Sequence, residues 1–493
     1  MVTFAQMTMA ARLVRILKRL LLLLVVVAAS LFGVRAYESQ RGVPLQLWHT
    51  YVPHELTAAQ IDKSDWISWL AAEDATFREV RAEVVDKLDE ASRTVSNRYF
   101  AGSPIYPGKF VHDWNRSYVL EPDGPAVGAV VLLHGLTDAP YSLRHVARLY
   151  RDHGFVAVGV RLPAHGTVPA ALTDVEWEDW DAAARLAVRE ARRRAGPSVP
   201  LHIVGFSNGG ALAVEYALEA LDDDRLARPD RLILISPMIG ITAFARFAGL
   251  AALPAMFPAF AKAAWLGILP EFNPFKYNSF PVNGARQSHR LTRTLQERLS
   301  ATARDGRLQR MPPILTFQSV VDFTVSTRAV ISSLYGLLPP NGSELVLFDL
   351  NRAAKISSGL LRSASETVLT RILPDPPRNY RTTVIANVTD DRQDVAERVT
   401  EAGATTQRTR PLGLAFPPGL FSLSHVALPF PTSDALYGLE PDEEESFGVN
   451  LGAIAPRGER GVLIVDLDAL VRVSSNPFFP YVADRLVQGM ANR

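Results

Sequence analysis

The sequence has no cysteine among its 493 residues. Disulfide bonds, thiolate zinc sites and cysteine nucleophiles are therefore excluded. An excess of charge is also missing, because 52 basic and 51 acidic residues leave a formal net charge of +1. A nucleic-acid-binding protein needs a clustered basic face, so this balance favours no nucleic-acid partner. No motif for a metal ion or an organic cofactor is present, and we expect neither.

Long apolar runs are scarce as well, and one near the amino terminus, Leu20–Val34, follows Arg12, Arg15, Lys18 and Arg19. Fifteen helical residues reach about 22 Å. That length is short for a bilayer core of roughly 30 Å and at the upper edge for a signal peptide. We favour an uncleaved anchor over residues 1–36 with its amino terminus inside. A cleaved signal segment with secretion is the second interpretation, and a buried core helix is the third.

The first two interpretations both export the rest of the chain, to the periplasmic side if the protein is bacterial. Residues 37–110 then form a helical extension. Its stretch "SDWISWLAAEDATFREVRAEVVDKL" has helical periodicity, and Ser64 is the predicted N-cap.

Apolar strands alternate with amphipathic helices in the remaining region, residues 111–493. Examples of the strands are "GAVVLLHG", "FVAVGVRL", "LHIVGF" and "RLILISPM". Strands that are apolar on both faces indicate a mostly parallel sheet covered by helices on both sides, an α/β doubly wound fold. Two segments interrupt the pattern. Residues 241–311 are predicted to be a helical lid insertion, and residues 352–410 a second insertion with its own strand, "TTVIANV".

One predicted turn in this pattern contains a candidate nucleophile. The pentapeptide Gly205-Phe206-Ser207-Asn208-Gly209 lies between a predicted strand and a predicted helix. In that position it is typical of a nucleophile elbow, where the glycines give a strained serine the room for a tight turn. The alternative is an ordinary turn with Ser207 as a helix N-cap.

A serine nucleophile needs a base and an orienting carboxylate. On such a sheet their chain order is serine, acid, histidine. Asp322 follows the strand that resumes after the first insertion, and Asp349 and Asp375 are its rivals. Beyond Asp322 the chain has a single histidine, His425.

Two backbone N–H groups are expected to form the oxyanion hole. We assign them to Asn208, after the nucleophile, and to Leu136 in the loop "HGLTDAP". We interpret His134 and His165 as structural, because both precede the acid in the sequence.

The motifs "VVLLHGLTDAP", "RLPAHG", "VGFSNGG", "SVVDFTV" and "SHVALPF" together resemble the α/β-hydrolase superfamily, and within it the group of monoacylglycerol lipases and related esterases. The resemblance implies Ser207 as nucleophile, His425 as base, Asp322 as acid, and Leu136 and Asn208 as oxyanion donors. The chain departs from that group at Asn208, where its lipases often have methionine. It also departs in the separation of about a hundred residues between acid and histidine.

The leading hypothesis is a serine hydrolase that cleaves a carboxylic ester, with a lipid-like or apolar acyl part, through an acyl-enzyme. An amidase, a peptidase and an acyltransferase use the same triad and remain open. A non-catalytic, membrane-tethered binding protein on a hydrolase fold is the alternative outside enzymes. The natural substrate and the oligomeric state stay open.

Overall fold

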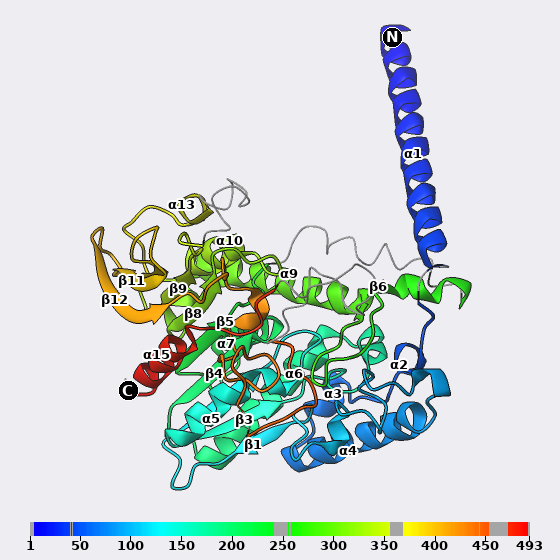
Figure 1. The fold of residues 1–493 in the computed structure, drawn as a ribbon. Coiled ribbons are helices and arrows are strands. Elements are labelled where there is room, and N and C mark those ends of the chain that lie inside the picture. Colours follow the sequence, from blue (N-terminus) through cyan, green and yellow to red (C-terminus); the bar gives the residue numbers. More distant parts are fainter. Residues whose placement is uncertain are drawn as a thin grey trace.

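A ten-stranded sheet runs through the protein in a computed structural model that describes residues 4–39, 41, 43–240, 255, 258–354, 368–442, 444–452 and 472–491. Its strand order is β1-β3-β2-β4-β5-β8-β9-β10-β11-β12. The strands are β1 (Tyr118–Leu120), β2 (Gly128–Leu133), β3 (Phe155–Val160), β4 (Leu201–Phe206), β5 (Arg231–Ile235), β8 (Ile314–Ser319), β9 (Glu344–Phe348), β10 (Arg381–Asn387), β11 (Asp394–Thr400) and β12 (Gln407–Ala415). The seven neighbouring strands from β3 to β10 pair in parallel, and β1, β11 and β12 add antiparallel edges. The mostly parallel sheet predicted from the sequence is confirmed (Figure 1).

Helices cover both faces of the sheet, as the fully apolar strands require. The main ones are α5 (Arg144–Asp152), α6 (Trp177–Ala195), α7 (Asn208–Asp222), α9 (Val282–Arg304) and α15 (Phe479–Ala491). Strand β2 shows how the two faces divide. Its residues Ala129, Val131 and Leu133 join the core formed with α6, α7 and α9. Val130 and Leu132 point the other way, into the core formed with α5 and α15.

The amino-terminal extension contains several helices and packs beside α6. It contains α2 (Leu47–Thr50), α3 (Ala58–Ile61), α4 (Trp66–Val80) and a π-helical turn, η1 (Arg81–Val85). The predicted N-cap was wrong by one residue. Asp65, not Ser64, caps α4, because its carboxylate accepts the Ser68 amide N–H at 2.8 Å.

Helix α1 (Phe4–Ser39) stands clear of the body of the molecule (Figure 1). Within it, 22 residues from Leu13 to Val34 are apolar enough to cross a membrane, and at 1.5 Å per residue they reach about 33 Å. None of that window is buried, so the interpretation as a buried core helix is wrong. By length and composition the helix is suited to be a membrane anchor or a signal sequence.

The predicted lid segment and second insertion lie partly outside the described residues. Of the first, residues 241–254, 256 and 257 lie outside; η8 (Pro258–Ala264) contacts α1, and α9 packs on α7. Of the second, residues 355–367 lie outside. Its predicted strand is confirmed as β10, which continues the main sheet beside β9 and is followed by β11 and β12. The apolar run "GVLIVDL" at residues 461–467, whose pattern predicts a further strand, also lies outside the described residues.

Candidate active site

The turn between β4 and α7 holds Ser207 in a strained backbone conformation. Its φ of 53° and ψ of −113° lie where residues with a side chain are rarely found. The Ser207 amide donates to the Ile235 carbonyl at 3.0 Å, and the Ser207 carbonyl accepts from Gly210 and Met238. These bonds hold the serine at the carboxyl end of the sheet, so the sharp strand-to-helix turn predicted from the sequence is present.

The glycines around Ser207 have no space for a side chain. A Cβ on Gly209 would lie 1.9 Å from the Leu133 carbonyl oxygen, and one on Gly205 would lie 2.3 Å from the Gly209 carbonyl oxygen. Sequence reasoning missed Gly210, where a Cβ would lie 2.7 Å from the Pro237 Cβ. The three glycines let α7 start directly against β2 and β5.

Asp322 and His425 lie together although 103 positions separate them in the sequence. Asp322 follows β8, and His425 begins the short helix η11 (His425–Ala427). The His425 Nδ1 lies 2.9 Å from the Asp322 Oδ2. The His425 ring stacks on that of Phe206, the residue before Ser207, with centroids 5.4 Å apart. The structure thus brings the predicted base and acid to the elbow.

The Asp322 side chain is buried and accepts several hydrogen bonds. Its Oδ1 accepts the amides of Thr324 at 2.8 Å and Val325 at 2.9 Å. Burial raises the pKa of Asp322, but the charge and hydrogen bond of His425 and the two amides outweigh burial, so the pKa lies below its ordinary value. Asp322 is therefore a carboxylate at neutral pH.

Gln318 is a contact of the acid that sequence reasoning missed. Its Nε2 donates to the Asp322 Oδ2 at 3.0 Å, the same oxygen that faces His425. Gln318 is fully buried at the end of β8, and its Nε2 is also 3.1 Å from the Thr327 Oγ1. Its position four residues before Asp322 was the only available signal.

The rival acids lie elsewhere. Asp349 follows β9, and its carboxylate is 3.5 Å from the Arg352 guanidinium. Asp375 is exposed to solvent.

The two predicted oxyanion donors flank the elbow. Leu136 follows Gly135, where an added Cβ would lie 3.3 Å from the Ser207 Cβ, so this loop passes directly beside the serine. Within the described ranges, the Leu136 amide has no hydrogen-bond acceptor. Asn208 is the first residue of α7, where the amide has no partner inside the helix. Its side chain is buried and its Oδ1 lies 3.4 Å from the Ser288 Oγ on α9.

His134 and His165 support loops near the elbow, in keeping with the structural role predicted for them. The His134 Nε2 accepts the Leu162 amide at 3.0 Å, and its Nδ1 lies 2.9 Å from the Gly135 carbonyl oxygen. Burial lowers the pKa of His134 well below its usual value and that of His165 to about 4. Both rings are therefore neutral at pH 7. In the described part of the chain, no group of three or more histidine and acidic side chains is arranged to hold a metal ion.

A second Asp–His contact fixes the segment that follows His425. The Asp434 Oδ2 lies 2.6 Å from the Arg144 guanidinium and 2.9 Å from the His145 Nε2. Asp434 and Arg144 are both fully buried. This network fastens the segment after His425 to the start of α5.

The mostly parallel sheet, the strained serine at the strand-to-helix turn and the Asp–His pair behind it define an α/β-hydrolase fold with the arrangement of a serine hydrolase. Residues 124–334 match the family described as serine aminopeptidase, S33. The match runs from just before β2 to η10 (Val330–Tyr335), and it contains Ser207 and Asp322.

Solved structures similar to the chain include metagenome-derived lipolytic enzymes, LipS and LipT, at 22% identity over 48% of this chain and 86% of that chain, with a TM-score of 0.37. A soluble variant of monoglyceride lipase from Saccharomyces cerevisiae is 13% identical over 47% of this chain and 81% of that chain, with a TM-score of 0.37. A carboxyl esterase from Bacillus coagulans is 14% identical over 47% of this chain and 83% of that chain, with a TM-score of 0.36. Among curated proteins, none matches the sequence.

Proposed function

We propose that the protein hydrolyses a carboxylic ester, with Ser207 as nucleophile, His425 as general base and Asp322 as the orienting acid. The observation that carries the proposal is the 2.9 Å contact between Asp322 and His425 at an elbow whose serine is strained. The Ser207 Oγ attacks the ester carbonyl carbon while the His425 Nε2 takes its proton. The amides of Leu136 and Asn208 donate to the oxyanion that forms.

The second half of the reaction returns the enzyme to its starting state. Collapse of the tetrahedral intermediate breaks the ester C–O bond, and His425 gives its proton to the leaving alcohol. Water, deprotonated by His425, then attacks the acyl-serine carbonyl; the bond to the Ser207 Oγ breaks, His425 gives its proton to that oxygen, and the carboxylic acid leaves. Asp322 keeps the Nδ1 proton of His425 directed toward itself and stabilises the imidazolium that forms in each half.

A lipid-like substrate is supported by the position of the lid segment beside the anchor. The Lys262 Nζ in η8 donates to the Arg41 carbonyl at 3.2 Å, just after α1. Leu266 and Leu269, which follow η8, are 41% and 42% exposed. The chain then continues into α9, whose Ser288 contacts Asn208 at the elbow. With α1 as an uncleaved anchor, this connection supports a substrate that reaches the site from the membrane surface.

The family description favours a second candidate, an aminopeptidase or amidase on the same triad. A panel of p-nitrophenyl esters of increasing acyl length, measured beside aminoacyl p-nitroanilides, separates the two. We expect ester turnover that rises with acyl length and is at least about 100-fold faster than anilide turnover. Faster cleavage of the anilides would overturn the ester assignment, and an unreactive wild type would indicate a binding protein. An acyltransferase would transfer the acyl group to an added alcohol faster than to water.

A further inference from the structure

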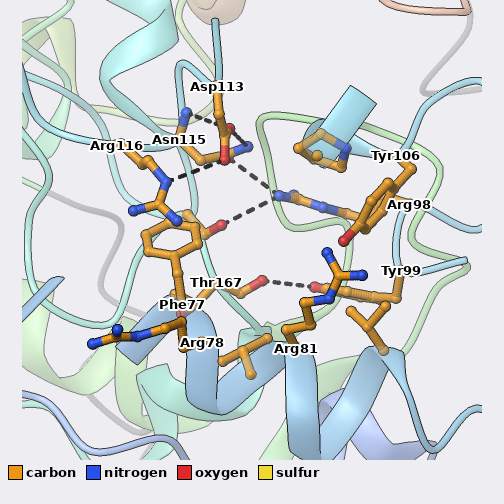
Figure 2. A pocket seen from close by; sticks show the side chains of 15 residues that line it. Phe77, Arg78, Arg81, Arg98, Tyr99, Tyr106, Asp113, Asn115, Arg116 and Thr167 are labelled. Atoms are coloured by element: carbon orange, nitrogen blue, oxygen red, sulfur yellow. Dashed lines mark hydrogen bonds and ion pairs between the residues drawn. The ribbon is translucent and has the colours of Figure 1, made fainter. Parts of the chain in front are cut away.

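A cavity of about 280 Å³ lies between the helical extension and the loop after β3, apart from the Ser207 elbow (Figure 2). Its walls combine arginine and aromatic side chains. The residues that carry the inference are Phe77, Arg81, Arg98, Tyr106, Asp113 and Arg116. Arg78 also lines the cavity, and Asp113 is its single acidic residue, so the lining has a formal charge of +3 from four arginines and one aspartate.

Arg98 is a buried cation without a carboxylate partner. It is 2% exposed, and its guanidinium donates to three neutral acceptors: the Asn115 Oδ1 at 3.2 Å and the carbonyls of Gly166 and Lys276 at 3.4 Å. Its Nε has no partner. Among the described residues, no carboxylate oxygen lies within 4.0 Å of this guanidinium.

The other buried arginines of the described chain are all paired. Arg144 contacts Asp434, Arg161 contacts Glu55, and Arg485 contacts Glu344. Pairing is the usual condition for burying a charge, because an unpaired buried ion loses its hydration without compensation. The buried carboxylate of Glu271 interacts electrostatically with Arg98 but makes its hydrogen bonds with the amides of Asn278 and Ser279.

The walls of the cavity add one weakly paired cation, Arg81, and the apolar surface of Phe77 and Tyr106. Arg81 comes from the π-helical turn and is directed toward Arg98 and Tyr106 (Figure 2). Its contact with Asp86 is long, at 3.8 Å, and both side chains are exposed, so this pair contributes little. Arg116 lies over the Phe77 ring at 4.0 Å and is already paired, with Asp74 at 3.2 Å and Asp113 at 3.7 Å. Asp113 also accepts a hydrogen bond from the Asn115 side chain at 2.8 Å.

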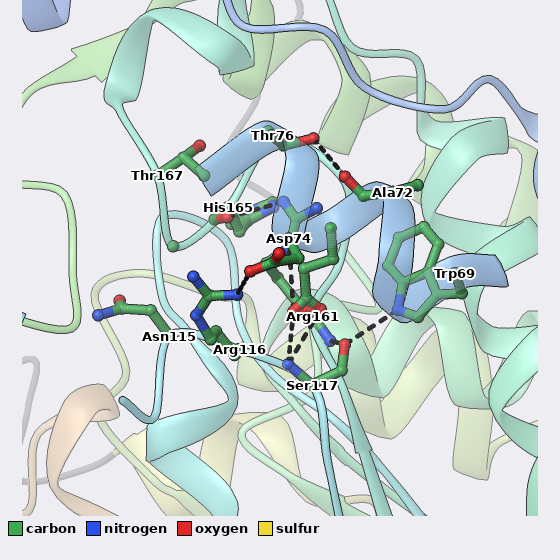
Figure 3. A network of polar contacts seen from close by, with 12 residues as sticks. Trp69, Ala72, Asp74, Thr76, Asn115, Arg116, Ser117, Arg161, His165 and Thr167 are labelled. Atoms are coloured by element: carbon green, nitrogen blue, oxygen red, sulfur yellow. Dashed lines mark hydrogen bonds and ion pairs between the residues drawn. The ribbon is translucent and has the colours of Figure 1, made fainter. Parts of the chain in front are cut away.

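A network of polar contacts holds this cavity in shape (Figure 3). The Trp69 indole N–H donates to the Ser117 Oγ at 3.0 Å, and the Ser117 amide donates to Glu73 at 2.9 Å. Arg161 makes a bidentate contact with Glu55, at 2.7 and 2.9 Å, and so joins the extension to the loop after β3. The walls are therefore fixed before any ligand arrives, which lowers the entropic cost of binding.

We propose that this cavity is a binding site for an oxyanion, a phosphate or carboxylate, carried on a small aromatic or apolar group. The anion takes the place of the carboxylate that Arg98 lacks and contacts Arg81, since guanidinium groups bind such anions bidentately. The apolar group lies against Phe77 and Tyr106. The oxyanion belongs either to a soluble metabolite or to a lipid headgroup, and the site does not depend on the proposed esterase chemistry.

Isothermal titration calorimetry of the full chain in detergent micelles tests the proposal, with phenyl phosphate, phenol and inorganic phosphate as probes. We expect phenyl phosphate to bind at least about tenfold more tightly than phenol. Arg81→Glu should weaken phenyl phosphate binding at least about tenfold, and Arg81→Lys about threefold, since lysine keeps the charge but not the bidentate geometry. Arg293→Glu is the matched control, because Arg293 is an exposed arginine paired with a nearby acid. It should leave binding unchanged.

Two more arms complete the experiment. Dihexanoyl phosphatidic acid, a soluble lipid, should bind more tightly than phenyl phosphate if the natural anion is a headgroup and more weakly if it is a small metabolite. Ser207→Ala should bind phenyl phosphate like the wild type, which separates this site from the elbow. Equal binding of phenol and phenyl phosphate, or equal weakening by Arg81→Glu and Arg293→Glu, would overturn the proposal.

Discussion

Two Asp–His pairs involve the segment from His425 to Asp434, and they differ in what surrounds them. Asp322 faces His425 at 2.9 Å, and Asp434 faces His145 at 2.9 Å. Each aspartate is buried, and each accepts two backbone amides. His425 lies against the elbow, whereas Arg144 shares Asp434 with His145. We therefore assign a catalytic role to the Asp–His pair that lies beside a nucleophile, and a structural role to the pair that lies beside a cation.

Replacing the acid of the first pair gives the largest expected effect. Asp322→Asn should lower kcat about 10⁴-fold, because an amide does not hold the histidine in the reactive tautomer or stabilise its charged form. The melting temperature should change little by comparison. Initial rates on a p-nitrophenyl ester and a thermal melt of the same preparation check both parts. A variant that keeps a tenth of wild-type kcat would remove Asp322 from the mechanism.

Replacing the acid of the second pair should affect stability instead. Asp434→Asn leaves the fully buried Arg144 without its closest counter-charge, which we expect to cost about 3–5 kcal/mol of unfolding free energy. Urea unfolding measures this loss, and kcat per folded molecule should stay within about threefold of wild type. Asp152→Asn, at an exposed aspartate paired with Arg151, is the control. A stable but inactive Asp434→Asn protein would reverse the roles of the two pairs.

The contribution of the two aspartates to the unfolding free energy depends on pH. Burial raises the pKa of Asp434, but Arg144 and His145 outweigh it, so the pKa in the folded state lies below the unfolded value, as it does for Asp322. A lowered carboxyl pKa stabilises the fold above the unfolded pKa of about 3.9, and this stabilisation is lost as pH falls through the folded pKa. The unfolding free energy of the wild type should thus decrease as the pH falls below about 4. Asp434→Asn should flatten this slope, and an unchanged slope would contradict the assigned charge.

Gln318→Ala should give the smallest effect. It removes a hydrogen bond to the Asp322 oxygen that faces His425, and we expect kcat to fall roughly tenfold, about 1.4 kcal/mol, with KM unchanged. The kcat of Gln318→Glu should fall further, because this variant places a second carboxylate beside Asp322. A rise in KM at constant kcat would indicate a contact with substrate instead.

The central sheet and the elbow were predictable from the sequence because their signals are local. Buried parallel strands are continuous apolar runs, and the residues between β4 and α7 leave few alternatives to a tight turn. The predicted Asp322 and His425 meet because the chain order leaves a single histidine after the acid. No local pattern marks β12, whose exposed residues include Arg408, Thr409 and Arg410, because an edge strand has no continuous apolar face.

The contacts that depend on distant residues were missed for the same physical reason. Arg144 and Asp434 are 290 positions apart, and nothing in either neighbourhood of the sequence shows that they pair. Arg98 resembles an ordinary surface arginine in the sequence, since its burial arises only when the extension packs on the loop at Gly166. The assignment of catalytic roles to Ser207, Asp322 and His425 stays a prediction that chemistry must test.

Covalent labelling of Ser207 tests the proposed mechanism most directly. The full-length protein is treated with a fluorophosphonate probe, digested and analysed by mass spectrometry. We predict one adduct on Ser207, no adduct in Ser207→Ala, and labelling slowed by at least about 100-fold in Asp322→Asn, with Asp434→Asn labelled at the wild-type rate while folded. An adduct on another residue, or undiminished labelling and ester turnover in Ser207→Ala, would contradict the account.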